Sequence, residues 1–361
     1  MTYKIAHFAS YHINAGDNIT ITNVRNSLNT LRADISWSEI NILDFLDRRN
    51  DLEFCIKSFK KISEDFDMLL LGGGGLIEAN KNTGTGHKLP LNKEVMEHIN
   101  IPIVLYGVGV NYFRNKPKFD EQDILVLNDV LQGATLVSVR NDGSLESLQE
   151  IGLASKIIEI PDPGLLCSNP KGRIEKVREG FLQPAWNTGQ AILDGRSLTR
   201  ENISMISSIM STSNISRLIP HSIKDYNLAS RLGKFCIYDI QGYKEQVSFN
   251  RYQEIFEDYR KYDYIVAMRG HGQLVSIGMN IPGIYFSTQD KLLSFSKKNG
   301  FMDYTVDIEE KDWANNLTKK IERLKSDKEY LEEWYKIRDR NMTEYERQNT
   351  NFAKKVRDLM K

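Results

Sequence analysis

Short apolar runs alternate with longer polar stretches along the first half of the chain. The runs are too short for core helices and several end in glycine or proline, so they predict buried parallel strands. We expect strands at residues 5–9, 68–71, 103–106, 136–139 and 157–160. Helices are expected at residues 20–31, 55–63, 93–99, 122–132 and 144–151. This alternation predicts an open α/β sheet with helices on both faces.

The pattern breaks at residues 167–189, where prolines and glycines cluster and predict a linker. Strands are then expected at residues 191–193, 217–219, 235–238, 264–267 and 284–286, with helices at 202–210, 224–232, 250–259 and 272–279. We therefore expect two Rossmann-like α/β domains facing a cleft, at residues 1–168 and 190–308. Residues 309–361 are charged, with apolar positions at helical spacing, which predicts amphipathic helices packing on the domains.

Composition narrows the function. The 48 Lys and Arg residues balance 48 Asp and Glu residues, which argues against a nucleic-acid-coating protein or a polybasic membrane anchor. The three cysteines lie far apart, so neither a zinc site nor a disulfide framework is expected. No apolar run approaches the length of a membrane span, so we expect a cytoplasmic protein.

The first candidate site residues follow the first predicted strand. Asn14, Gly16 and Asp17 open the first helix, where free backbone amides attract anions. Asp17 is either the helix N-cap or a carboxylate aimed into the cleft as a base or as an acceptor of a sugar hydroxyl.

Two glycine-rich segments follow the next strands. Gly73, Gly74 and Gly75 lie in a run of four glycines, and Gly107 and Gly109 come after the following strand. The run of four glycines has the spacing of neither a phosphate-binding nor a dinucleotide-binding loop. A tight turn between strand and helix is one interpretation of each segment. Because two such segments follow adjacent strands, we favour a side-chain-free surface that binds a phosphate or sugar.

Arg140 ends the next predicted strand, with Ser144 shortly after it, and Asp162 follows the strand beyond. Arg140 at a strand end is suited to bidentate binding of a carboxylate or phosphate, although a salt bridge to Glu146 is the alternative. Asp162 lies between two prolines that stiffen its turn, and a plain turn residue is the other interpretation.

The most informative segment, residues 264–273, predicts a strand, a turn and a helix start. Arg269, Gly270, His271 and Gly272 lie at that turn, where an arginine, an imidazole and free amides converge. Three further candidates, His221, Asp225 and Lys291, are expected at strand ends of the same domain. His221 and Asp225 form a pair.

Taken in order, these motifs resemble the polysaccharide pyruvyl transferase family. The resemblance also includes Asp162-Pro163, Gly278 with Ile281-Pro282, and Lys291 before Phe295. It implies a fold of the glycosyltransferase B-type and transfer of a pyruvyl group from phosphoenolpyruvate onto two sugar hydroxyls as a ketal. The sequence departs from the family at Gly270, where relatives carry leucine.

The resemblance implies roles for the candidates. Arg140 and Arg269 are expected to clamp phosphoenolpyruvate, His271 to act as acid or phosphate-stabilising group, and Asp17 to act as base. This chemistry requires neither a metal nor a cofactor, and the cleft is expected to be locally positive.

The acceptor is expected to be a sugar in a polysaccharide or in a lipid-linked glycan precursor. A lipid carrier would favour peripheral contact with the inner face of the membrane, for which the aromatic and basic segment 112–119 is the candidate. The alternative for that segment is a solvated loop. Two other functions stay open: a glycosyltransferase that uses a sugar nucleotide on the same fold, and a non-catalytic two-lobed binding protein.

Overall fold

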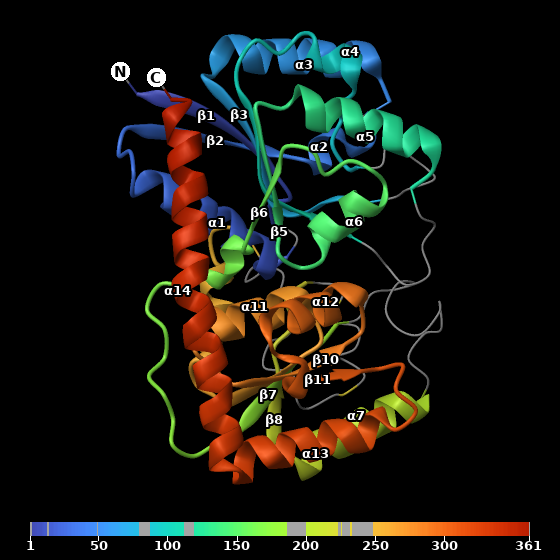
Figure 1. The fold of residues 1–361 in the computed structure, drawn as a ribbon, viewed down its shortest axis with the longest axis vertical. Helices are drawn as coiled ribbons and strands as arrows, with labels where there is room; N and C mark the ends of the chain where they lie inside the picture. Colours follow the sequence, from blue (N-terminus) through green and yellow to red (C-terminus); the bar gives the residue numbers. More distant parts are fainter. Residues whose placement is uncertain are drawn as a thin grey trace.

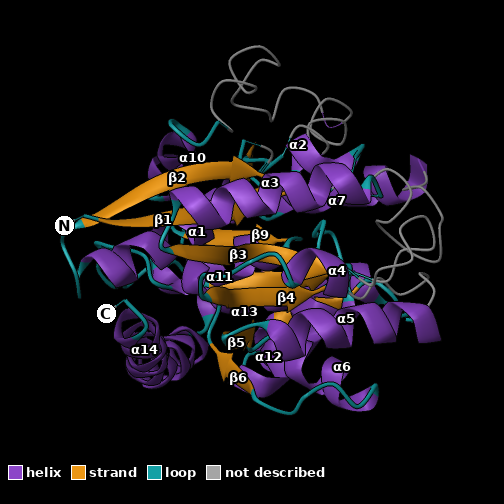
Figure 2. Cartoon of the chain, turned by 90° about the horizontal axis from the view of Figure 1, so that it is seen from above, coloured by secondary structure: helices purple, strands orange, loops and turns teal. Residues whose placement is uncertain are grey.

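Two parallel β-sheets organise the molecule, one in the upper and one in the lower half of Figure 1. The computed structural model describes residues 2–12, 14–48, 50–78, 87–111, 119–185, 200–222, 225, 232 and 248–360. The first sheet has six strands in the order β2-β1-β3-β4-β5-β6, which Figure 2 shows side by side. They are β1 (Tyr3–Ala9), β2 (Ile35–Asn41), β3 (Met68–Ile77), β4 (Ile103–Val110), β5 (Leu136–Arg140) and β6 (Ile157–Ile160).

Side chains of this sheet alternate between two separate apolar layers, because successive residues of a strand point to opposite faces. In β3, Leu69 and Leu71 join one layer, whereas Met68 and Leu70 join the other. The first layer is covered mainly by α3 (Leu52–Asp65), α5 (Glu121–Gly133) and α6 (Ser144–Glu150). The second is covered by α1 (Ala15–Asn29) and α14 (Lys328–Asp358). Two short helices complete this domain, α2 (Leu43–Leu46) and α4 (Lys93–Met96).

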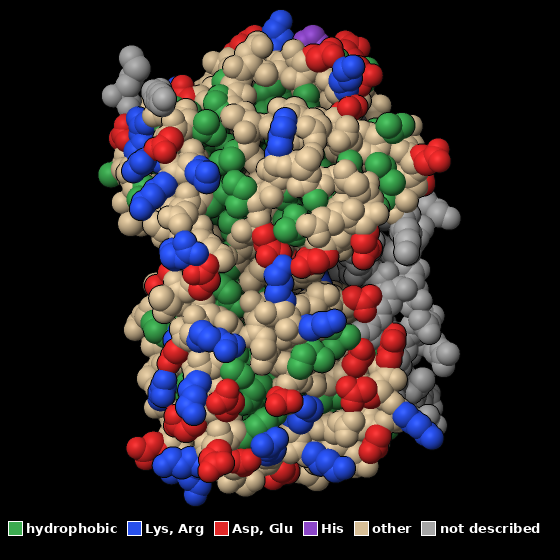
Figure 3. Space-filling model, viewed as in Figure 1, with side chains coloured by type: hydrophobic (Ala, Val, Ile, Leu, Met, Phe, Trp, Pro, Cys, Tyr) green, Lys and Arg blue, Asp and Glu red, His purple; other side chains and the backbone are tan. Residues whose placement is uncertain are grey.

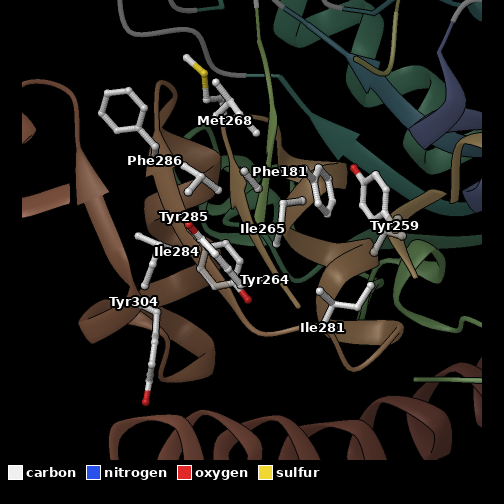
Figure 4. Close-up of a cluster of buried hydrophobic side chains, with 14 of the residues drawn as sticks. Phe181, Tyr259, Tyr264, Ile265, Met268, Ile281, Ile284, Tyr285, Phe286 and Tyr304 are labelled. Carbon is white, nitrogen blue, oxygen red and sulfur yellow. The ribbon is translucent and has the colours of Figure 1, made fainter. Parts of the chain in front are cut away.

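The second sheet has five strands in the order β11-β10-β9-β7-β8. They are β7 (Gly180–Gln183), β8 (Ile215–Leu218), β9 (Tyr264–Ala267), β10 (Gly283–Ser287) and β11 (Thr305–Asp307). Figure 4 shows the aromatic and aliphatic side chains that these strands and their neighbours bury. The helices around them are α7 (Arg200–Thr212), α10 (Tyr252–Tyr259), α11 (Gly270–Gly278), α12 (Asp290–Asn299) and α13 (Trp313–Ser326).

Three strands differ from the sequence-based expectation. The linker expected at residues 167–189 contains β7, so the second sheet begins before residue 190. Strand β2 was missed because it is a half-exposed edge strand with few apolar residues, and β11 because it is only three residues long. The strands expected at 191–193 and 235–238, most of the helix at 224–232, and most of segment 112–119 lie outside the described residues.

Of the two C-terminal helices, α13 packs on the second domain and α14 packs on both domains. Trp313, Leu317 and Ile321 of α13 are buried at the expected helical spacing. Helix α14 then runs along both domains in Figure 1, with its end close to the N-terminus. Its early residue Trp334 packs in the second core, whereas Phe352 packs against the first sheet.

The surface in Figure 3 mixes basic and acidic side chains over both domains, in keeping with the balanced composition. None of the helices in the described part of the chain combines the length and the apolar composition that crossing a membrane requires.

Candidate active site

The residues singled out from the sequence gather where the two domains meet, at the carboxyl ends of parallel strands. The first strand of each sheet lies next to an edge, and the second strand adds at that edge. The chain then crosses to the other side of the first strand, so the order reverses between β1 and β3 and between β7 and β9. Ligands of open α/β sheets bind at such switch points. Asp17 follows β1 and Arg269 follows β9, so both lie beside one.

His271 joins the domains at the centre of this region. It lies in the first turn of α11, and its ring reaches the first domain. Its Nδ1 lies 3.6 Å from Asp17 Oδ1, and its Nε2 lies 3.6 Å from Asp162 Oδ2. Nε2 also lies 3.5 Å from the hydroxyl of Thr20. Since Asp162 is fully buried and Asp17 is 21% exposed, a ligand has access to the imidazole from the side of Asp17.

Arg140 is buried in the first domain and is already ion-paired. Its Nη1 donates to Asp162 Oδ2 at 3.0 Å, and its Nη2 lies 2.9 Å from Asp142 Oδ2. Burial alone would raise the pKa of Asp162, but the Arg140 charge together with His271 and the Gly164 N–H outweighs it and holds this pKa well below its usual range. The expected alternative partner, Glu146, binds Lys298 instead.

Arg269 is ion-paired as well, within the second domain. Its Nε and Nη2 donate to the two carboxylate oxygens of Asp225 at 2.7 and 2.6 Å. Asp225 also accepts from the backbone N–H groups of His221 and Ser222. Burial, reinforced by the Arg269 charge, holds the pKa of His221 well below its usual range, so this imidazole is neutral at pH 7.

Lys291 differs from both arginines, because no carboxylate of the described residues lies within ion-pair distance of its ammonium group. Among the described residues, the hydrogen-bond partner of its Nζ is Asn111 Oδ1, at 3.4 Å across the domain boundary. Burial, reinforced by the Arg140 charge, lowers the pKa of Lys291 to about 8. A Cβ on Gly270 would lie 3.6 Å from Lys291 Cε, an ordinary contact, so the departure from the family leaves room beside this lysine.

The expectation of a locally positive cleft is not met. The cationic side chains of the site are Arg140, Arg269 and Lys291. The carboxylates beside them are Asp17, Asp142, Asp162 and Asp225. Positive charge without an acidic partner is therefore confined, within the described part of the site, to Lys291.

The glycine segments do not form tight turns. They are parts of strands β3 and β4. Gly73 and Gly74 have φ values of 76° and 127°, which side-chain-bearing residues rarely adopt. A Cβ on Gly74 would lie 3.2 Å from Asp17 Oδ1, and one on Gly109 would lie 1.9 Å from Arg140 Nη2. The glycines thus let the strands approach the charged side chains of the site.

Several other candidates hold the backbone in place. Asn14, not Asp17, caps α1, since its side chain accepts from the Gly16 N–H at 2.8 Å. Ser144 Oγ accepts from the Val110 N–H at 2.8 Å. A Cβ on Gly272 would lie 2.4 Å from the side-chain oxygen of Gln183, so this glycine serves close packing.

A sequence model of the family described as polysaccharide pyruvyl transferase matches residues 14–290, which include every candidate site residue except Lys291. The chain belongs to the polysaccharide pyruvyl transferase family. No curated protein matches the chain.

Solved structures show that this pyruvyl transferase family member has the glycosyltransferase B-type fold. HepE of Anabaena, in complex with UDP and glucose, has a TM-score of 0.52 at 8% identity, covering 99% of this chain and 98% of that one. Apo UGT2 of Phytolacca americana has a TM-score of 0.51 at 10% identity, covering 99% and 100%. MnaA of S. aureus, solved with UDP, has a TM-score of 0.50 at 11% identity, covering 91% and 90%. At these identities the likeness concerns the fold alone.

Sequence reasoning missed several residues of the family member's site. Thr20, Asn111, Asp142 and Gln183 all contact a predicted site residue but were not selected. Three of them, Asn111, Asp142 and Gln183, lie at or just beyond the carboxyl end of a strand, and this position was the available signal.

Substituting Gly16 by alanine is expected to lower the melting temperature by several degrees. The new Cβ would lie 2.3 Å from His271 Cβ, which is not the end of a flexible side chain, so α1 and α11 must separate. Overpacking of this kind costs about 1–3 kcal/mol. Gly172→Ala is the matched control, since nothing lies within 4 Å of its added Cβ. Equal melting temperatures for the two variants would contradict the close approach of the domains at His271.

Proposed function

We propose that this protein transfers the enolpyruvyl group of phosphoenolpyruvate onto two hydroxyls of a sugar, forming a pyruvate ketal. The acceptor would be a sugar of a polysaccharide or of a lipid-linked glycan precursor. Family membership supports the reaction class. The observation that carries the proposal is the meeting of His271 and Asp17 beside Lys291, at the switch points of both sheets.

The donor carries about three negative charges near neutral pH, counting its carboxylate and phosphate. Lys291, with a pKa of about 8, is mainly protonated at pH 7 and has no acidic partner among the described residues. Helices α11 and α12 both begin beside it, and helix N-termini favour anions. Because Arg140 and Arg269 are each paired with carboxylates, we assign the direct contact with the donor to Lys291 rather than to the arginines.

The ketal reaction needs two proton movements that balance. A proton adds to the methylene carbon of the donor, and one acceptor hydroxyl attacks the neighbouring carbon and loses its proton. The carbon–oxygen bond to phosphate then breaks, and the second hydroxyl attacks the same carbon. The two hydroxyl protons end on the new methyl group and on the released phosphate.

His271 and Asp17 are suited to these steps. Asp17, the partly exposed carboxylate, would accept the hydroxyl proton, and Nδ1 of His271 would deliver a proton to the methylene carbon. Asp162, which faces Nε2 on the buried side, would orient the imidazole. The 3.6 Å separations exceed hydrogen-bond length, as is common before substrate tightens a site.

Phosphoenolpyruvate is expected to raise the melting temperature of the protein and, with a glycan acceptor, to release inorganic phosphate. A ligand that binds only the folded state stabilises it by mass action, by about 2.7 kcal/mol at a hundred times its Kd. The acceptor product should carry one acid-labile pyruvate, which mass spectrometry detects. UDP-sugars form the parallel arm, and stabilisation by these without any effect of phosphoenolpyruvate would contradict the proposal in favour of glycosyl transfer.

A further inference from the structure

Asn111 lies directly after β4 and contacts both domains. Its backbone N–H donates to Ile77 O at 2.7 Å, and its side-chain Nδ2 donates to Gly75 O at 2.9 Å. Its Oδ1 accepts from Lys291 Nζ at 3.4 Å. The amide thus connects the glycine-rich part of β3 with the first turn of α12.

The orientation of this amide is fixed by its surroundings. Gly75 O only accepts hydrogen bonds, so the NH₂ group must face it and the amide oxygen must face Lys291. Position 75 must be glycine for the Asn111 amide to fit here, because a Cβ on Gly75 would lie 2.2 Å from Asn111 Nδ2. Gly75 O also accepts from Lys88 Nζ at 3.3 Å, so this carbonyl keeps a partner if the amide is altered.

Charges of both signs surround the Lys291 ammonium. Those that lower its pKa are Arg140 and Arg269, and those that raise it are Asp142 and Asp17. The group in hydrogen-bond range, Asn111, is neutral. A carboxylate at this position would form an ion pair and compensate the charge, whereas an amide oxygen holds the ammonium and leaves its charge available.

We propose that Asn111 is a positioning residue that holds the Lys291 ammonium between the domains without neutralising it, so that its charge is available to an anionic substrate. The hydrogen bond between Lys291 and Asn111 is given by the geometry, whereas its use in binding an anionic substrate rests on the proposed function. Asn111 acts through Lys291 and need not touch the substrate.

Asn111→Asp tests the contact without any substrate. The variant keeps the shape of the side chain but places a carboxylate at the ammonium, and such a neighbour raises a lysine pKa by about 1–3 units. The readout is the pH dependence with which Lys291 reacts with an amine-directed reagent, followed by peptide mass spectrometry. In the wild type we expect the labelling midpoint of Lys291 near its pKa of about 8, and in Asn111→Asp we expect a higher midpoint. Lys298→Met is the matched control, since Lys298 also lies on α12 and pairs across the domain boundary with Glu146 and Glu159. In this control variant, the labelling midpoint of Lys291 should stay at the wild-type value.

Steady-state kinetics test the use of the contact. In Asn111→Asp and in Asn111→Ala, KM for phosphoenolpyruvate is expected to rise about tenfold, which is 1.4 kcal/mol, with a smaller change in kcat. An unmoved Lys291 midpoint in Asn111→Asp would overturn the contact. A moved midpoint with wild-type KM in both variants would overturn the positioning role. If wild-type protein neither binds nor turns over phosphoenolpyruvate, the proposed function fails, and the labelling midpoint still decides whether Asn111 holds Lys291.

Discussion

His271→Ala is expected to lower pyruvyl transfer by about 10²–10⁴-fold, the usual contribution of a positioned acid or base. The imidazole of His271 extends from the second domain to Asp17 and Asp162 in the first. Its loss removes the proposed proton donor and leaves both carboxylates in place. The substitution leaves no buried ion without a partner, because Asp162 keeps Arg140. The melting temperature should therefore stay close to that of the wild type.

Two measurements separate this role from a structural one. His98→Ala, which removes an exposed histidine, should retain wild-type turnover. The alkaline limb of the pH profile of kcat/KM should change in His271→Gln, which keeps polar volume but has no acidic proton to transfer. Near-normal turnover in His271→Ala would remove this residue from the mechanism.

Arg140→Met is expected to lower the free energy of unfolding by about 3–5 kcal/mol at pH 7, the cost of removing one partner of a buried pair. Arg140 pairs with two buried carboxylates, Asp142 and Asp162, and both would lose their guanidinium partner. Urea titration of both proteins measures the difference. Activity should fall in parallel, because Asp162 also faces His271.

The pH dependence of this loss has a definite sign. The pKa of Asp162 is depressed in the folded protein, so the pair contributes stability above the unfolded pKa of about 3.9, and this is lost as pH falls through the folded value. In the variant the carboxylate no longer has that depressed pKa and protonates more easily. The stability gap between the two proteins should therefore narrow below about pH 4. Lys298→Met, which removes part-exposed ion pairs, should cost at most about 1 kcal/mol, and an equally small cost for Arg140→Met would contradict the buried cluster.

The positions of most strands could be predicted from the sequence, because their apolar runs are continuous and end at polar or glycine residues. The same reasoning predicted that Asp17, Arg140 and His271 lie at the cleft, because ligands bind beyond the carboxyl ends of parallel strands. What the sequence could not show is the pairing of the charges. Asp225 lies 44 residues from Arg269, and Asp162 lies 22 residues from Arg140, so their contacts depend on packing rather than on local spacing.

The glycine segments show a second limit. Glycine is poor in strands, so runs such as residues 72–75 predict turns. In the folded protein they extend β3, because a strand without side chains lets α1 approach: a Cβ on Gly73 would lie 3.0 Å from the Ile21 backbone nitrogen. Tertiary approach thus overrides the local preference.

The path of α14 has a consequence for biosynthesis. One face of the first sheet is covered by Phe352, Ala353 and Val356, which the ribosome adds after both sheets have been made. This apolar layer, which contains Met68 and Leu70, therefore has only the cover of α1 on that side, without α14, throughout translation of the second domain. Exposed apolar strands of this kind promote aggregation of nascent chains. The N-terminal domain, although synthesised first, completes its core last, so part of its apolar surface is exposed for longer during synthesis than its two-domain architecture alone would suggest.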